Sequence, residues 1–226
     1  MKESSEMITP SDVDYQKTKQ IKRNGKSLES PFSELADWFE SEYKVPVLNM
    51  HYDTVIPDDR PRLNLIFEKE NDALKFRNGP LGNFNKIDQK CVAEQFCSIL
   101  ERHSKHQMKT KDLFVIFTAF ETVARIEANE SVSEKEICKL KRDLDNGNLW
   151  KISRLFDSVT FFFYTYDQAK KAVERGLLDK YSHAYSKLVA KYDEFGYHEN
   201  RPVSAHFDSK ENFDTNFQSN WYYYYK

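Results

Sequence analysis

Residues 161–171 read FFFYTYDQAKK, and this stretch joins the end of a strand to the start of a helix. Consecutive phenylalanines favour a strand that ends at Phe163. Asp167 follows four residues later, and a carboxylate is stabilising near the positive N-terminal end of a helix. Ala169 is small and apolar, so that helix can pack back onto the sheet. The stretch therefore predicts a strand that delivers a phenylalanine to the core and then runs into a helix.

Three other segments share this pattern, namely LIFEKENDALK (65–75), VIFTAFETVAR (115–125) and AHFDSKENFDT (205–215). Each has a phenylalanine, a polar residue four positions later, and an apolar residue two positions beyond that. The four phenylalanines are Phe67, Phe117, Phe163 and Phe207, spaced by 50, 46 and 44 residues. Spacing in this range is typical of a repeated structural unit.

The patterns around these segments predict the remaining elements. Apolar residues at helical spacing predict helices over 30–43, 86–103, 133–144 and 177–196, the third opened by a capping box at Ser133. Apolar and β-branched runs predict strands over 47–55, 63–68, 112–120, 149–156 and 158–166. We expect an α+β fold with antiparallel sheets and helices on one side. Tandem ferredoxin-like units, built from the repeated strand–helix element, are one arrangement that fits.

The chain divides into three parts in this interpretation. Residues 1–30 lack hydrophobic periodicity, which predicts a flexible polar leader. Its stretch KTKQIKRNGK carries five cations, and it is either a basic arm for an acidic partner or a solvated tail. The ordered remainder forms α+β halves over 31–130 and 131–226, which can also form one continuous domain.

The composition narrows the function classes. The 226 residues are 39% hydrophobic and 15% aromatic, with a formal net charge of -2. This balance gives no general attraction to nucleic acid or to an anionic membrane, and no apolar run is long enough to span a bilayer. Three cysteines without paired spacing indicate free thiols in a reducing compartment. With no apolar segment of a secretory signal near the N-terminus, we expect a cytoplasmic protein.

The sequence contains no Gly-x-Ser-x-Gly, phosphate-binding loop, dinucleotide fingerprint or His-Glu-x-x-His. We therefore predict no catalytic, cofactor-binding or metal-binding residue. His51 and Asp53 stand two apart on a predicted strand, hence on one face. Such a pair can act as a general base with its orienting carboxylate, or it can be the polar outer face of a hairpin. His206 is the other histidine that a dispersed acid–base site could use.

The stretch NWYYYYK (220–226) predicts a closing strand, because aromatic residues are strong strand formers. Alternation would place Trp221, Tyr223 and Tyr225 on one face and Tyr222 and Tyr224 on the other. The second face is the better candidate for an exposed contact surface. The candidate binding residues are Trp221, Tyr222, Tyr224, His51 and Asp53.

Three function classes follow from these observations. The first is a non-catalytic protein–protein interaction module with a protein partner, a class that includes inhibitor and immunity-type proteins; its basis is the high aromatic content without a catalytic motif. The second is an enzyme with a dispersed acid–base site on His51, Asp53 or His206. The third is a single-strand nucleic-acid binder that stacks bases on Trp221 and the tyrosines. The net charge and the lack of basic residues beside the aromatics count against the third class.

Overall fold

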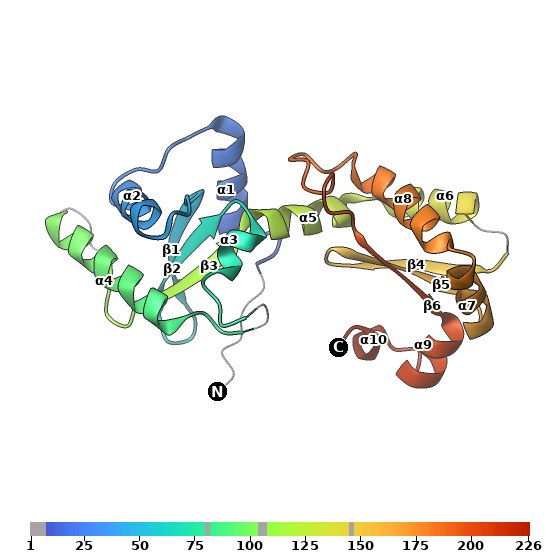
Figure 1. Ribbon diagram of the computed structural model, residues 1–226. Coiled ribbons are helices and arrows are strands. Elements are labelled where there is room, and N and C mark those ends of the chain that lie inside the picture. The colour runs from blue at the N-terminus through green and yellow to red at the C-terminus, as the bar shows by residue number, and fades with distance from the viewer. Residues whose placement is uncertain (1–7, 80–81, 104–107, 145–146) are drawn as a thin grey trace. The chain divides into compact units, whose positions relative to one another are not determined.

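The protein has an α+β fold in the computed structural model, which describes residues 8–79, 82–103, 108–144 and 147–226 (Figure 1). Internal contacts divide the chain into two compact units, one up to Val123 and the other from Ala124 onward. The helix α5 (Phe120–Ser131) contains this division. The boundary expected from the sequence was at residue 130, within the same helix.

Both units share the order helix, two strands, two helices and strand, and a helix follows the last strand of each, which for the first unit is α5. The first unit contains α1 (Val13–Asn24), α2 (Phe32–Tyr43), β1 (Asn49–Val55), β2 (Arg60–Phe67), α3 (Glu70–Leu74), α4 (Lys86–Arg102) and β3 (Phe114–Ala119). The second contains α6 (Glu134–Leu144), β4 (Leu149–Leu155), β5 (Ser158–Phe163), α7 (Tyr166–Glu174), α8 (Leu177–Val189), β6 (Ser204–Ser209), α9 (Lys210–Phe217) and α10 (Trp221–Tyr225). The common order begins at α2 in the first unit and at α6 in the second.

Each unit has a mixed three-stranded sheet. The first two strands form an antiparallel hairpin, and the third strand pairs in parallel with the second. The expectation of antiparallel sheets is therefore wrong for β3 and β6, and a ferredoxin-like arrangement is not shown. The physical reason is the connection: two helices separate the second strand from the third and return the chain to the same end of the sheet, as a parallel pair requires.

The four similar segments occupy two kinds of position. Phe67 and Phe163 end the middle strands β2 and β5, each followed by a short helix. Phe117 and Phe207 lie inside the third strands, paired across the sheet with Leu65 and Phe161. Each unit thus uses the strand–helix element twice, once for its middle strand and once for its third.

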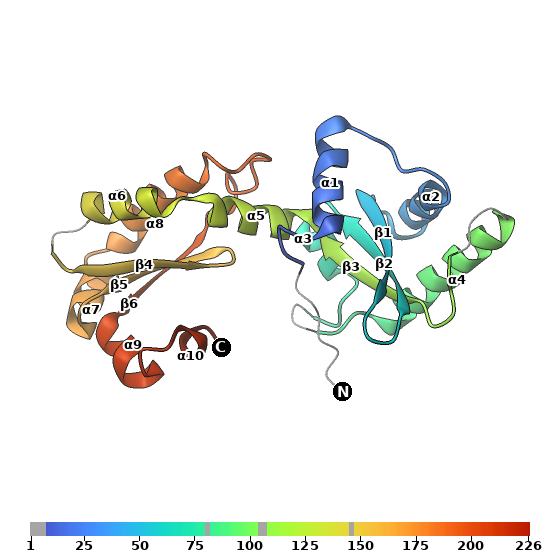
Figure 2. The ribbon, with the colours of Figure 1, turned by 180° about the vertical axis from the view of Figure 1, so that it is seen from behind.

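Helices cover both faces of each sheet, although the sequence predicted helices on one side. In the first unit α2, α3 and α4 pack on one face through a core that includes Phe39, Phe96 and Phe117. The helix α1 lies on the other face of that sheet (Figures 1 and 2). In the second unit α6, α7 and α8 cover one face around Phe161 and Tyr185, while α9 and α10 lie against the other.

The expected flexible leader contains α1, so order begins well before residue 30. Its residues Asp14, Tyr15 and Thr18 are buried. The sequence pattern missed this helix because two of its three buried side chains are polar. They dock by hydrogen bonds, which leave no hydrophobic periodicity to detect.

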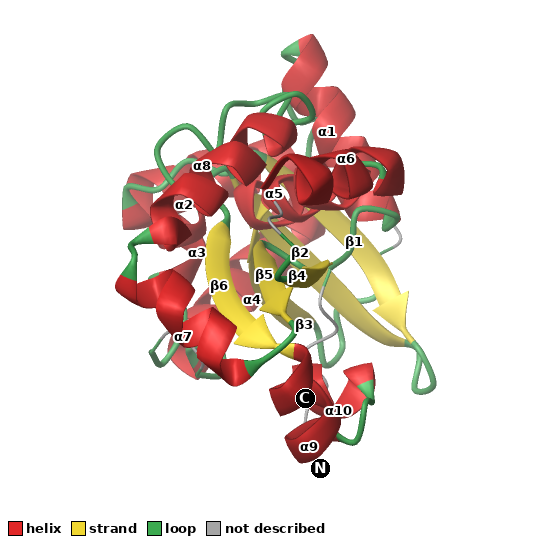
Figure 3. Cartoon of the chain, turned by 90° about the vertical axis from the view of Figure 1, so that its right-hand side faces the viewer, coloured by secondary structure: helices red, strands yellow, loops and turns green. Residues whose placement is uncertain are grey.

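The expected closing strand is wrong as well, because residues 221–225 form the helix α10, drawn in red in Figure 3. The side chain of Asn220 accepts a hydrogen bond from the Tyr222 amide at 2.9 Å and caps the helix. Gln218 and Ser219 precede it with φ of 54° each, which turns the chain back toward its own sheet. Helical spacing then places Trp221, Tyr224 and Tyr225 on one side.

A buried arginine connects three segments of the second unit. The side chain of Arg125 in α5 is only 2% exposed. Its Nε donates to Asp157 Oδ2 at 2.8 Å, in the turn between β4 and β5. Its Nη1 donates to the carbonyl oxygens of Tyr197 and Arg201, at 2.9 and 2.6 Å, in the loop before β6. One planar guanidinium therefore holds a helix, a hairpin turn and a loop.

We expect Arg125→Leu to lower the free energy of unfolding of the second unit by about 3–5 kcal/mol, because it leaves the Asp157 carboxylate and two carbonyls without their donor. Urea unfolding followed by tryptophan emission measures this change. Arg142→Leu, on the exposed face of α6, is the matched control and should stay within about 0.5 kcal/mol of the unmodified protein. Equal losses in the two variants would contradict the role of Arg125.

The capping box predicted at Ser133 is confirmed at the start of α6. The Glu136 carboxylate accepts hydrogen bonds from the Ser133 amide at 3.1 Å and from the Tyr192 hydroxyl at 2.7 Å. Lys191 Nζ lies 3.1 Å from its other oxygen. These contacts, the Tyr192 hydrogen bond foremost, lower the pKa of Glu136 from 4.5 to about 2. The lowered pKa means that folding favours the ionised form.

The contribution of Glu136 to stability should therefore be present above about pH 4.5 and be lost as the pH falls toward 2. Glu136→Gln should shift the urea midpoint downward near neutral pH, and the difference from the unmodified protein should shrink on acidification. Urea titrations at a series of pH values test this, with Glu174→Gln on α7 as the control. A difference in urea midpoint that does not change with pH would show that the charge of Glu136 contributes nothing to stability.

Candidate functional site

The helix α10 sends its aromatic side chains in two directions. Trp221, Tyr224 and Tyr225 turn toward the sheet and α9, whereas Tyr222 and Tyr223 are 66% and 50% exposed. The rings of Tyr222 and Tyr223 lie side by side, with centroids 5.8 Å apart. We call these two residues, together with Lys226, the α10 surface.

Trp221 anchors α10 to the second face of its sheet. Its ring stacks on Phe213 of α9 at 4.1 Å and on Trp150 of β4 at 6.2 Å between centroids. It also meets Phe162 of β5 edge-on at 5.4 Å. With protein rings on these sides, the indole serves packing, which counts against its use as the stacking platform of the nucleic-acid hypothesis.

Two tyrosines fix the helix by hydrogen bonds. The Tyr224 hydroxyl donates to Asp208 Oδ2, and the Tyr225 hydroxyl donates to Ser153 Oγ, both at 2.7 Å. Burial, with the neighbouring Asp208 carboxylate, raises the pKa of Tyr224 far above its usual value; burial also raises the pKa of Tyr225. Both hydroxyls therefore stay protonated and keep donating throughout the physiological range.

Lysines lie over this aromatic cluster. Lys151 Nζ is 4.5 Å from the Trp221 ring centre, and Lys226 Nζ is 5.5 Å from that of Tyr222. Lys210 sits 5.4 Å above Trp150 while it pairs with Asp214. Lys151 and Lys210 are distant along the chain from residues 221–225, so the local sequence around the tyrosines does not show them. The fold brings them to within cation–π distance.

The five predicted binding residues fall in two places. Tyr222 is exposed on the α10 surface, and its exposed neighbour is Tyr223, which the strand interpretation had placed on the opposite face. Trp221 and Tyr224 serve mainly to dock the helix. His51 and Asp53 share a face of β1, in the first unit, while His206 lies on β6 in the second.

The Asp53 carboxylate is already engaged. Arg62 Nε and Nη2 donate to its two oxygens at 2.9 and 2.6 Å, a bidentate pair across the hairpin. A carboxylate held in this way does not orient the His51 imidazole. His206 Nε2 lies 3.0 Å from Ser204 Oγ on the exposed end of β6. Neither histidine forms a nucleophile–base–carboxylate arrangement with the residues that the structure describes.

A serine, a histidine and a carboxylate do meet elsewhere in the first unit. Ser30 Oγ lies 3.3 Å from His103 Nε2 and donates to Glu34 Oε1 at 2.9 Å. The same Glu34 oxygen is 2.5 Å from the same His103 nitrogen. In a catalytic triad the carboxylate binds the ring nitrogen opposite the serine. Here both partners share Nε2, so the cluster does not have the arrangement of a catalytic triad.

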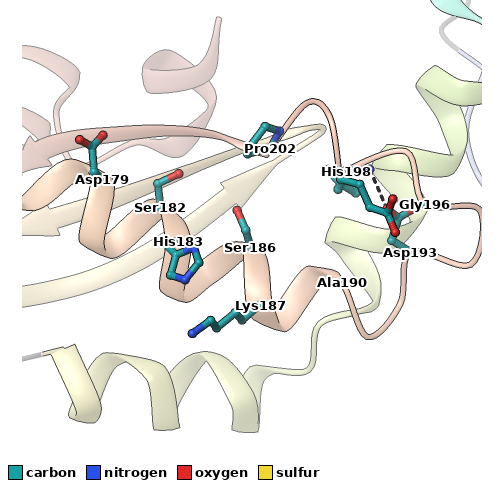
Figure 4. Close-up of a pocket in the computed structure, with 11 residues that line it drawn as sticks. Asp179, Ser182, His183, Ser186, Lys187, Ala190, Asp193, Gly196, His198 and Pro202 are labelled. Atoms are coloured by element: carbon teal, nitrogen blue, oxygen red, sulfur yellow. Dashed lines mark hydrogen bonds between the residues drawn. The ribbon is translucent and has the colours of Figure 1, made fainter.

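The helix α8 and the loop that follows it line an open groove of about 480 Å³ (Figure 4). Its main polar residues are Ser182, Ser186 and Lys187 from α8, and Asp193, His198 and Glu199 from the loop. Asp193 accepts hydrogen bonds from the amides of Tyr197 and His198, so its charge stabilises the loop itself. The groove can admit a small polar molecule.

Two histidines line the groove, and of these His183 on α8 is exposed whereas His198 is covered. His198 is only 6% exposed, and its Nε2 lies 3.3 Å from the Arg125 carbonyl oxygen. A carbonyl only accepts, so Nε2 carries a hydrogen. The other ring nitrogen, Nδ1, is buried 3.8 Å from Asp157 Oδ1, and neither atom has a hydrogen-bond partner among the described residues. A general base must reach its substrate, and this nitrogen is covered.

Within the described residues no group of three or more His, Cys, Asp or Glu side chains is placed to hold a metal ion. None of the helices in those parts of the chain has the length and apolar character needed to cross a membrane. Comparison with family models, with curated proteins and with solved structures finds no match for this chain. Function therefore has to be argued from the residues and their geometry.

Ser186 provides a test of the groove. Its hydroxyl oxygen is buried and has no hydrogen-bond partner in the described part of the chain. Removing a buried, unsatisfied hydroxyl removes a desolvation cost, so Ser186→Ala should leave stability unchanged or raise it by up to about 1 kcal/mol. Urea unfolding of this variant and of Ser182→Ala, one turn earlier on α8, gives the comparison. A loss of more than about 1 kcal/mol would instead mean that the oxygen has a bound partner in solution.

Proposed function

We propose that this chain is a non-catalytic protein-binding module whose contact surface is the α10 surface. The observation that carries the proposal is the display of Tyr222 and Tyr223 on a helix whose other side is fixed by Trp221, Tyr224 and Tyr225. Exposed tyrosines on a rigid support offer a large contact area at a small cost in conformational entropy, which is why such residues dominate binding hot spots.

The surroundings suit a protein partner. Lys226 lies over the Tyr222 ring and adds a cation at the edge of the aromatic pair. The tyrosine hydroxyls can donate to acceptors on the partner. Inhibitor and immunity-type proteins belong to this functional class. Cytoplasmic action suits the three cysteines Cys91, Cys97 and Cys138, which are all free.

The two alternatives have less support. An enzyme would need an acid–base site, yet Asp53 is paired with Arg62 and His198 of the groove is covered. The other groove histidine, His183, is exposed but has no hydrogen bond to a carboxylate among the described residues. A sheet-based nucleic-acid binder would need an open aromatic face, yet helices lie on both faces of each sheet. The lysines around the aromatic cluster are the one feature in its favour, so the test below separates nucleic acid from protein.

The proposal predicts that Tyr222→Ala with Tyr223→Ala lowers recovery of one specific protein partner at least about tenfold. Each hot-spot truncation costs more than about 1 kcal/mol, and 1.4 kcal/mol is a factor of ten. The full chain is immobilised, exposed to nuclease-treated extract of the native host, and its bound proteins are quantified by mass spectrometry.

Tyr166→Ala is the matched control, because Tyr166 is a tyrosine of α7 with 64% exposure. It should retain the partner. Recovery that is equal in all three proteins, or equally lost in both variants, would contradict a contact at α10. Binding that is seen in untreated extract but not in nuclease-treated extract, and that falls steeply with salt, would instead identify nucleic acid as the ligand.

A further inference from the structure

The helix α1 rests on a polar face of the first sheet. Asn64 Nδ2 donates to Asp14 Oδ2 at 2.9 Å, and Asn49 Nδ2 donates to Thr18 Oγ1 at 2.8 Å. The side-chain oxygen Oδ1 of Asn64 accepts from Thr118 Oγ1 at 2.8 Å. Strands of both orientations thus contribute side chains to a buried hydrogen-bond network beneath the helix.

Apolar packing of α1 rests on one side chain, Tyr15, which is 2% exposed and stacks on Phe120 at 5.2 Å between ring centroids. The large core cluster around Phe39, Phe96 and Phe117 includes no described residue of α1. A typical net hydrogen bond contributes only about 1 kcal/mol, and a 12-residue helix is marginal by itself. Since α4 places Val92 and Phe96 in the core, α1 should open at a lower free energy than α4.

His51 lies on the face that α1 covers. It shares this face of β1 with Asn49 and Asp53 and stands opposite Asn64 in the ladder, half-buried. Its ring forms no hydrogen bond with the residues that the structure describes. The charged groups that act on the ring are Asp14 and Lys17 from α1, Asp53 from β1 and Arg62 from β2.

We propose that α1 is a hinged cover over this polar face and that protonation of His51 releases it. Gly25 follows the helix in the left-handed region, with φ of 60°, and begins the segment on which α1 can swing away. Once α1 is released, the amides of Asn49 and Asn64 bind water, so opening leaves no buried polar group unpaired. This device is independent of the α10 surface.

The direction of the pH effect follows from burial. Burial is the largest effect on the imidazole and lowers the pKa of His51, while the carboxylates of Asp14 and Asp53 raise it less. The docked state therefore favours the neutral ring. Docking is fully stabilised above the ordinary pKa of histidine and weakens as the pH falls through the lowered value. The charged ring regains water when α1 lifts away.

Hydrogen exchange of the full chain, read by mass spectrometry at about pH 7.5 and 5.5, tests the proposal. The measured quantity is the protection of α1 relative to α4 in the same sample, each corrected for the intrinsic exchange rate. We expect α1 to be less protected than α4 at both values. We expect its relative protection to fall at least about two-fold on acidification.

His51→Gln should abolish the pH-dependent part, whereas His206→Gln, a histidine of the second unit, should keep it. Asn64→Ala should weaken α1 protection about tenfold at both pH values, because it removes the donor to Asp14. Protection of α1 equal to that of α4 at both pH values would overturn the cover. Persistence of the pH effect in His51→Gln would overturn the role of that histidine.

Discussion

Each three-stranded sheet has two broad faces, so the two sheets of this chain have four faces that need to be covered. Each unit covers its first face in the same way, with helices packed on a middle strand that ends in phenylalanine. The second faces differ in chemistry. In the first unit the cover is α1, held by a polar network on Asn64 and by the buried ring of Tyr15. In the second unit it is α10, held by stacked rings on Phe162. The repeated architecture therefore supports two different surfaces, one that can open and one that is fixed.

The packing of α2, α3 and α4 on the first sheet, and of α6, α7 and α8 on the second, could largely be predicted from the sequence because it depends on hydrophobic patterns. The strand–helix pattern at Phe163 recurs at Phe67, and both residues end the middle strand of a unit. The apolar run of β3 also carried the typical signal of a parallel strand that is covered on both sides, although the sheets were expected to be antiparallel. The parallel pairing follows from the two-helix connection between the second and third strands. The local residue pattern of either strand does not reveal that connection.

The second faces could not be predicted in this way. Asp14 and Thr18 dock α1 without any apolar periodicity, so the helix looked like a solvated tail. The tyrosines of α10 have strand propensity. The helix cap at Asn220, together with the packing of Trp221, Tyr224 and Tyr225 at spacings of three and four residues, outweighs that propensity. Arg125 has partners 32, 72 and 76 residues further along the chain. The candidate binding residue Tyr222 could be named from the alternation of the tyrosines, whereas Lys151 and Lys210, which lie over Trp221 and Trp150, come from elements that are distant in the sequence.

The stacking of Trp150 on Trp221 also gives the protein two separable optical reporters. These two indoles lie with planes only 6° apart and belong to the second unit, whereas the third tryptophan, Trp38, lies in α2 of the first. Parallel indoles at this distance couple electronically, so the second unit has a near-ultraviolet signature that depends on α10 staying in place. The first unit has one tryptophan, and its ring packs against Phe39 and Tyr43, with no second indole beside it. Spectroscopy can thus follow the loss of each unit in one sample without any label.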